Sequence, residues 1–95
     1  MAQVEAVGIA WYRREDYQRL KEMFTDGSKL PDTFDEWFRL ARRTYRTLTA
    51  SGLRVERAYI DPEVFPAWCK ANGLKMNAKA RTYYGNAVAR RASSQ

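Results

Sequence analysis

The stretch LPDTFDEWFRLARRTYRTLTASG, from Leu30 to Gly52, decides the fold that this sequence predicts. Apolar side chains recur in it every three or four residues, which places them on one face of an α-helix: Phe34, Phe38, Ala41, Tyr45 and Leu48. The opposite face carries Arg39, Arg42, Arg43 and Arg46. Thr33 and Glu36 have the spacing of a capping box, and the helix is expected to end near Ala50, before Gly52.

The residues before this helix predict a strand and a shorter helix. Residues 4–12, VEAVGIAWY, form a short run rich in β-branched and aromatic residues, which indicates a β-strand. Both faces of this strand are largely apolar, so we expect it to be covered. A helix of about three turns should follow, with Glu15 and Asp16 in its first turn and Gly27 at its end.

The residues after the central helix predict a second strand and two further helices. Residues 53–60, LRVERAYI, alternate as a strand does and become apolar on both faces at their end. A short helix should run from Asp61 to Gly73, in which Pro66 either makes the first turn 3₁₀-like or moves the true start to a later residue. The last helix is expected at residues 78–91. Gly85 inside it marks either a close approach of another backbone or a weak point.

The predicted fold is a single small α+β domain covering residues 1–95, with a frayed tail at 93–95. Its elements follow the order β-α-α-β-α-α. If successive elements reverse direction, the two strands are antiparallel and are covered by the four helices. Because two strands alone are marginally stable in water, a homodimer that pairs an edge strand with that of another copy also remains open.

The composition excludes several classes of chemistry. The chain has 95 residues, no histidine and a single cysteine, Cys69, so it predicts no intramolecular disulfide, no usual zinc site and no histidine-based catalysis. We expect no metal and no cofactor. The longest apolar run, residues 6–12, is far too short for a membrane span, and the N-terminus lacks a signal-peptide pattern. A cytoplasmic location without membrane association is therefore expected.

Three segments carry a resemblance to known sequences: AWYRREDYQRL (10–20), LPDTFDEWF (30–38) and YIDPEVFPAWCKANGL (59–74). They resemble a group of small, uncharacterised bacterial proteins with an AWY strand end, a DxxDEW helix start and an IDPxxFxxWC segment. The similarity covers most of the chain. It implies a bacterial, cytoplasmic setting and one compact domain, and it supplies neither an activity nor a catalytic residue.

The distribution of charge points to an anionic partner. The formal charge is +6, and residues 37–60 carry six basic side chains against one acidic side chain, while residues 64–95 carry six against none. The arginine face of the central helix extends over about 10 Å, which matches two or three successive phosphates of one strand. We therefore predict a non-catalytic module that binds nucleic-acid phosphates. The expected contacts are Arg39, Arg42, Arg43, Arg46, Lys75, Lys79 and Arg81.

Other interpretations of these residues remain open. The arginines could form a solvated face paired with acids of the same chain, such as Asp35 and Glu36, or the module could bind an acidic protein instead. The last two helices partly match a helix-turn-helix with Gly73 as its turn glycine. A metal-free ribonuclease would use Tyr12, Asp16 and Arg13 or Arg14. Among the three tryptophans, Trp37 is the one expected to be most exposed.

Overall fold

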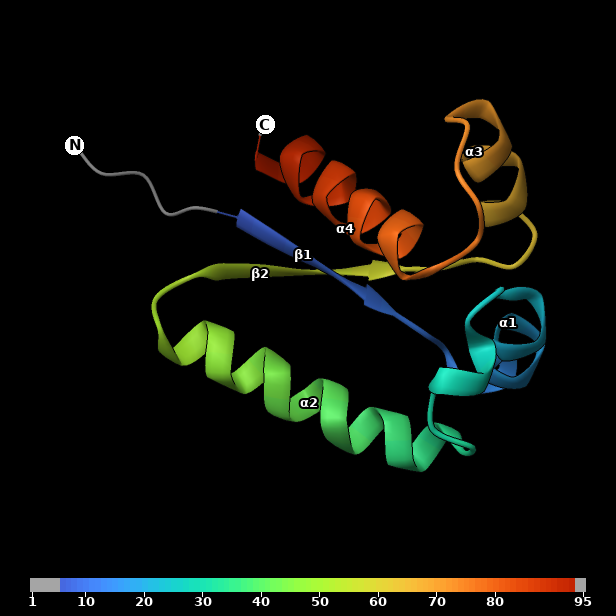
Figure 1. Ribbon diagram of the computed structural model, residues 1–95. Helices are drawn as coiled ribbons and strands as arrows, with labels where there is room; N and C mark the ends of the chain where they lie inside the picture. Colours follow the sequence, from blue (N-terminus) through green and yellow to red (C-terminus); the bar gives the residue numbers. More distant parts are fainter. Residues whose placement is uncertain (1–5, 94–95) are drawn as a thin grey trace.

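The computed structural model describes residues 6–93, and it has the predicted order of elements (Figure 1). They are β1 (Ala6–Trp11), the 3₁₀ turn η1 (Arg14–Asp16), α1 (Tyr17–Met23), the 3₁₀ turn η2 (Gly27–Lys29), α2 (Phe34–Ala50), β2 (Arg54–Tyr59), α3 (Phe65–Ala71) and α4 (Ala78–Ser93). The predicted strand start at residues 4–5 and most of the predicted frayed tail lie outside the described residues.

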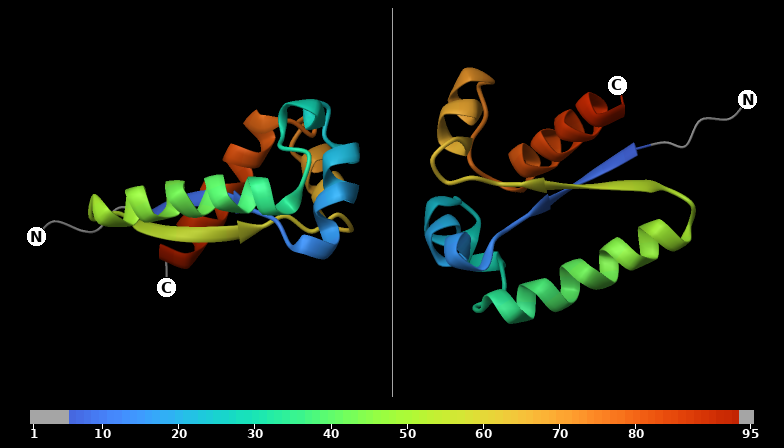
Figure 2. Two further views of the ribbon diagram at one scale, coloured as in Figure 1. Left: turned by 90° about the horizontal axis from the view of Figure 1, so that it is seen from below. Right: turned by 180° about the vertical axis from the view of Figure 1, so that it is seen from behind.

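The two strands form a thin middle layer between α2 and α4, which lie on opposite faces of the sheet (Figures 1 and 2). The Trp11 ring points toward α2, where its centroid lies 6.1 Å from that of Tyr45. Gly8 is on the opposite face of β1 and lies against the backbone of α4. The alternation of side chains along β1 thus separates a bulky face under α2 from a small face under α4.

The predicted antiparallel pairing is wrong, because β1 and β2 run parallel, with Val7 beside Val55 and Trp11 beside Tyr59. The error arises from α1. This helix has seven residues, about 10 Å in length, whereas the six residues of β1 extend over about 20 Å. It therefore stays at the carboxyl end of β1 and does not cross the sheet (Figure 1). Only α2 returns along the sheet, so β2 starts again at the end where β1 starts.

The predicted ends of α2 agree with the local hydrogen bonds, whereas α1 ends at Met23, before the predicted stop at Gly27, which instead opens η2. The Thr33 hydroxyl accepts from the Glu36 backbone N–H at 3.2 Å, which is the N-cap bond of the predicted capping box, and it donates to the Glu36 carboxylate at 2.9 Å. Gly52 follows that helix at φ +90°, a conformation that favours glycine. The Asp61 carboxylate accepts from the Glu63 N–H at 2.8 Å, and α3 begins only at Phe65. Pro66 therefore occupies the first turn, where it breaks no helical hydrogen bond.

The core is mainly aromatic, and Trp37 belongs to it. Only 8% of Trp37 is exposed, so the prediction that it is the most exposed tryptophan is wrong. Its ring lies 4.7 Å from the Tyr12 ring, 5.3 Å from Trp11 and 5.9 Å from Tyr17, measured between centroids. These partners come from the end of β1 and from α1, which sequence periodicity within α2 could not place. Cys69 is buried, as expected for a small apolar residue.

Gly85 marks a close approach between two backbones. A Cβ atom at Gly85 would lie 2.8 Å from the carbonyl oxygen of Gly8, and a Cβ at Gly8 would overlap the carbonyl oxygen of Gly85. Real Cβ atoms do not approach backbone oxygens so closely, and neither neighbour is a flexible side chain that could move aside. Of the two predicted explanations for Gly85, the close approach is therefore the correct one.

We expect Gly85→Ala to lower the free energy of unfolding by about 1–3 kcal/mol, because forcing a methyl between these backbones costs more than the gain in helix propensity. Asn86→Ala, at the exposed neighbouring position, should be neutral or slightly stabilising. Urea unfolding followed by circular dichroism measures both. Equal stability of the two variants would contradict the close packing of α4 on β1.

Candidate nucleic-acid interface

The outer face of α2 carries four exposed arginines that line one surface depression of about 540 Å³. The depression is lined by Asp35, Phe38, Arg39, Arg42, Arg43, Arg46 and Thr47. The spacing of the arginines at i, i+3, i+4 and i+7 aligns them along the helix axis. We call Arg39, Arg42, Arg43 and Arg46 the arginine row.

Contacts between the inner face of α2 and the sheet keep the arginine row on the solvent side of the helix. Phe38 and Tyr45 both contact Trp11 of β1, each with a centroid separation of 6.1 Å. Ala41, between them on the same face, is buried. Because these contacts fix the rotation of the helix about its axis, the opposite side of α2 must face away from the sheet.

The arginine row forms no ion pair with any residue in the described range 6–93. Asp35, the acid that lines the same depression, pairs with Arg14 at 2.8 Å. Glu36 accepts a hydrogen bond from the hydroxyl of Thr33. Arg42 contacts a ring, with its guanidinium carbon 5.9 Å from the centroid of Phe38. The interpretation that this face is neutralised by acids of the same chain is therefore not supported.

The second predicted basic segment lies apart from the row. Lys75 and Lys79 are exposed, but they lie just before α4 and in its first turn, and α4 covers the face of the sheet opposite to α2 (Figure 1). The structure therefore does not bring these lysines beside the arginine row. A single straight phosphate backbone lying on α2 would not reach them.

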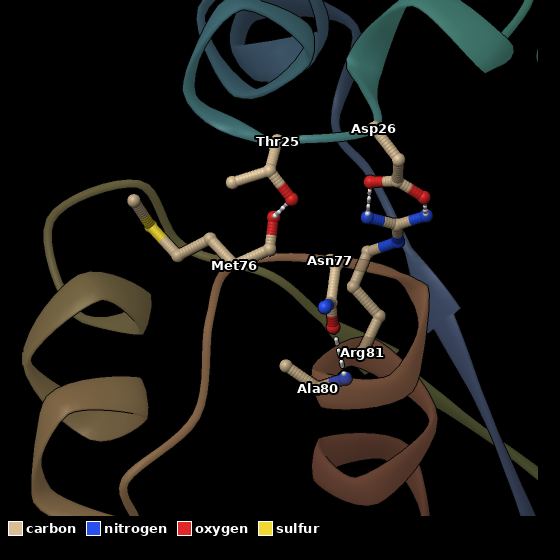
Figure 3. Close-up of polar contacts among 6 residues, drawn as sticks. All are labelled: Thr25, Asp26, Met76, Asn77, Ala80 and Arg81. Carbon is tan, nitrogen blue, oxygen red and sulfur yellow. Dashed lines mark hydrogen bonds and ion pairs between the residues drawn. The ribbon is translucent and has the colours of Figure 1, made fainter.

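Arg81, the remaining predicted contact, is occupied inside the molecule. It is only 7% exposed and donates two hydrogen bonds to the carboxylate of Asp26, at 2.8 and 2.9 Å (Figure 3). Its guanidinium carbon also lies 4.4 Å from the centroid of the Phe24 ring. Nearby, Thr25 donates its backbone N–H to the carbonyl of Met76 at 2.8 Å. The Asp26–Arg81 pair therefore joins the segment after α1 to α4, and we do not include Arg81 in the interface.

The helix-turn-helix interpretation does not fit the geometry of α3 and α4. Residues 72–77 separate the two helices, whereas the motif uses a turn of three or four residues. The α4 helix also lies against the sheet through Gly85 and the buried Ala89, so its inner face is not free to contact bases.

Three residues of the ribonuclease hypothesis are occupied by other contacts, and Asp16 lies at the end of η1, as the N-cap of α1. Tyr12 is buried, and this burial raises its pKa to about 12, which makes the phenol a weaker acid than an exposed tyrosine. The guanidinium of Arg14 pairs with Asp35, and that of Arg13 lies over the ring of Tyr59, 4.6 Å from its centroid. Within residues 6–93 no cluster of acidic or cysteine side chains could hold a metal ion. In that same range, no helix has the length and apolarity needed to cross a membrane.

Sequence reasoning missed two groups on the α2 side of the sheet. The guanidinium carbon of Arg57 lies 5.6 Å from the Trp11 ring centroid and 5.2 Å from that of Tyr45. Tyr59 is 41% exposed. The alternation in residues 53–60 places Arg57 and Tyr59 on one face and could have suggested them as a pair. Only the tertiary structure brings α2 and β1 against them.

Comparison of the chain with protein-family models, with curated proteins and with solved structures finds no match. The function must therefore be inferred from the charge and geometry of the arginine row and its surroundings.

We expect Asp26→Asn to lower the free energy of unfolding at pH 7 by about 3 kcal/mol, because it leaves the buried Arg81 charge without its counterion. Asp35→Asn, which removes an exposed pair with Arg14, should cost at most about 0.5 kcal/mol. Urea unfolding of both variants tests this difference. A loss of similar size in the two variants would contradict the role of the buried pair.

The Asp26–Arg81 pair predicts how the free energy of unfolding depends on pH. The hydrogen bonds from Arg81 lower the pKa of the Asp26 carboxyl. A lowered pKa in the folded state contributes stability above the pKa of the unfolded chain, about 3.9, and this contribution is lost as the pH falls through the folded-state value. Between pH 5 and pH 2, therefore, the wild-type protein should lose more stability than Asp26→Asn does.

Proposed function

We propose that this protein is a non-catalytic module that binds nucleic acid, contacting phosphates through the arginine row of α2. One observation carries the proposal: four exposed guanidiniums are aligned on one helix face, and none of them pairs with a carboxylate of the described residues. An exposed row of like charges repels itself, and an external polyanion would relieve that repulsion.

The dimensions of the row suit a phosphate backbone. From Arg39 to Arg46 the helix rises about 10 Å, and the planar guanidinium fork can donate two parallel hydrogen bonds to a phosphate. The carboxylate of Asp35 would repel phosphates at one end of the depression, but Arg14 neutralises it. The depression is not enclosed and its lining comes from one helix, which suits an extended polymer.

The double variant Arg42→Glu/Arg43→Glu should weaken the binding of a 20-nucleotide DNA or RNA at least tenfold at low salt, since it reverses two central charges of the row. The control is Lys29→Glu/Lys70→Glu, which makes the same change in net charge at two exposed positions that do not line the depression. Fluorescence anisotropy over a series of salt concentrations measures affinity and its salt slope. The slope for duplex DNA should be about 0.9 per phosphate contacted in a log-log plot.

Two results would count against this proposal. No retention of any nucleic acid at low salt would exclude it. An equal loss of nucleic-acid affinity in the two double variants would mean that binding depends only on net charge. If Arg42→Glu/Arg43→Glu instead abolishes binding of an acidic protein that co-purifies at low salt, the arginine row serves a protein partner.

A homodimer is a second candidate, favoured by the open edge of β1. This strand, AVGIAW, carries no charge, proline or bulge, although such features usually protect an edge. By contrast, β2 carries charged side chains at Arg54, Glu56 and Arg57. A groove of about 260 Å³ follows the outer side of β1, lined by Gly8, Ile9, Ala10, Ala78, Arg81 and Thr82. A second copy could add its own β1 there and extend the sheet to four strands.

If β1 pairs with another copy, Thr82→Arg should convert a dimer to a monomer, because a long charged side chain would fill this groove. Ala71→Arg, at an exposed position of α3 that does not line the groove, is the control and should leave the dimer intact. Light scattering coupled to size exclusion measures the mass of each. A monomeric wild-type protein at high concentration would exclude this candidate.

A further inference from the structure

Overlapping the arginine row at Arg42, three exposed arginines that form no ion pair within residues 6–93 lie over aromatic rings on the α2 side of the sheet. The guanidinium carbon of Arg42 is 5.9 Å from the centroid of Phe38, that of Arg57 is 5.2 Å from Tyr45, and that of Arg13 is 4.6 Å from Tyr59. These pairs come from α2, from β2 and from the segment after β1. We call these six residues the arginine–aromatic lane.

The buried ring of Trp11 lies among the three aromatic rings of the lane. Its centroid lies 6.1 Å from Phe38 and 6.1 Å from Tyr45 in α2, and Trp11 is the register partner of Tyr59 in β2. Register partners in a sheet point to the same face. The lane therefore continues from Phe38, which lines the depression of the arginine row, to Tyr59 at the carboxyl end of β2.

The arginines and Tyr59 of the lane are exposed, whereas Phe38 and Tyr45 are half-buried. Arg13 and Arg57 are exposed, and neither forms an ion pair within the part of the chain that the structure describes. Tyr59 is 41% exposed, with the Arg13 guanidinium on its ring. Other exposed arginines do pair with acids, such as Arg19 with Glu63 at 2.9 Å. The guanidiniums of the lane instead lie on rings, where a flat aromatic base could take their place.

The spacing of the lane favours separated bases. Arg57 and Tyr59 are two residues apart on β2, which places them about 6.7 Å apart along the strand. Stacked bases of a duplex lie about 3.4 Å apart, so neighbouring bases on these two sites could not remain stacked on each other. Proteins that bind single strands combine a basic track for the backbone with aromatic rings and arginine planes for the bases.

We infer that the ligand of this surface is single-stranded nucleic acid, whose phosphates contact the arginine row and whose unstacked bases lie on the arginine–aromatic lane. This inference rests on the proposed function and narrows its substrate class. A duplex could still reach the arginine row, but its paired bases would not present their faces to Tyr59.

The test compares a 20-nucleotide oligothymidine with a 20-base-pair DNA duplex, by fluorescence anisotropy at one low salt concentration. The wild-type protein should bind the single strand at least tenfold more tightly. Tyr59→Leu should lower affinity for the single strand about tenfold and leave duplex affinity unchanged, since it removes one stacking ring. Tyr59→Phe should keep the affinity, because the ring remains.

The matched control is Tyr83→Leu on α4. Tyr83 is 49% exposed, comparable with Tyr59, but it lies on a helix covering the other face of the sheet. The Tyr83→Leu variant should bind the single strand and the duplex as tightly as the wild-type protein does. Equal losses from Tyr59→Leu and Tyr83→Leu, or wild-type binding of the duplex as tight as that of the single strand, would overturn the inference. Duplex binding that still depends on Arg42 and Arg43 would leave the proposed function intact, whereas binding of neither nucleic acid would overturn both.

Discussion

The contact between the backbones of Gly8 and Gly85 is the constraint on which the arrangement of the layers depends. It brings α4 directly onto one face of β1, where even a methyl group would collide. The other face of the same strand carries Trp11, whose ring fills the space under α2. Because small and large residues alternate along β1, a sheet of only two strands holds a helix on each side. The fixed position of α2 in turn decides which of its side chains remain outside.

Arginine side chains have two different roles in this protein, depending on whether they are buried or exposed. Arg81 is buried between α4 and the segment after α1, and Asp26 compensates its charge with two hydrogen bonds. The arginines of the row remain in solvent, while the neighbouring acid Asp35 is paired with Arg14 from another element. No carboxylate of residues 6–93 pairs with the row, so the field outside α2 is positive, which is the physical basis for the ligand we propose.

The aromatic residues also divide into two groups. Trp37, Tyr12 and Tyr17 pack on one another inside the domain and provide much of its apolar contact. Tyr59 lies at the border of this core, with one ring face toward Arg13 and a large exposed fraction. Around Trp11 the aromatic core reaches the surface, and guanidiniums lie directly on its rings. Such an arrangement suits base stacking as well as phosphate contact.

The sequence by itself determined the local elements: the capped helix that begins after Thr33, its arginine face, the stop at Gly52 and the special position of Gly85. These follow from spacing and from backbone preferences over a few residues. The direction of β2, the burial of Trp37 and the pairing of Arg81 with Asp26 were decided only by the tertiary structure. Each depends on where a distant segment lies: the short α1 stays at one end of the sheet, and residues 55 positions apart form the buried ion pair. Periodicity carries no information on such long-range placement.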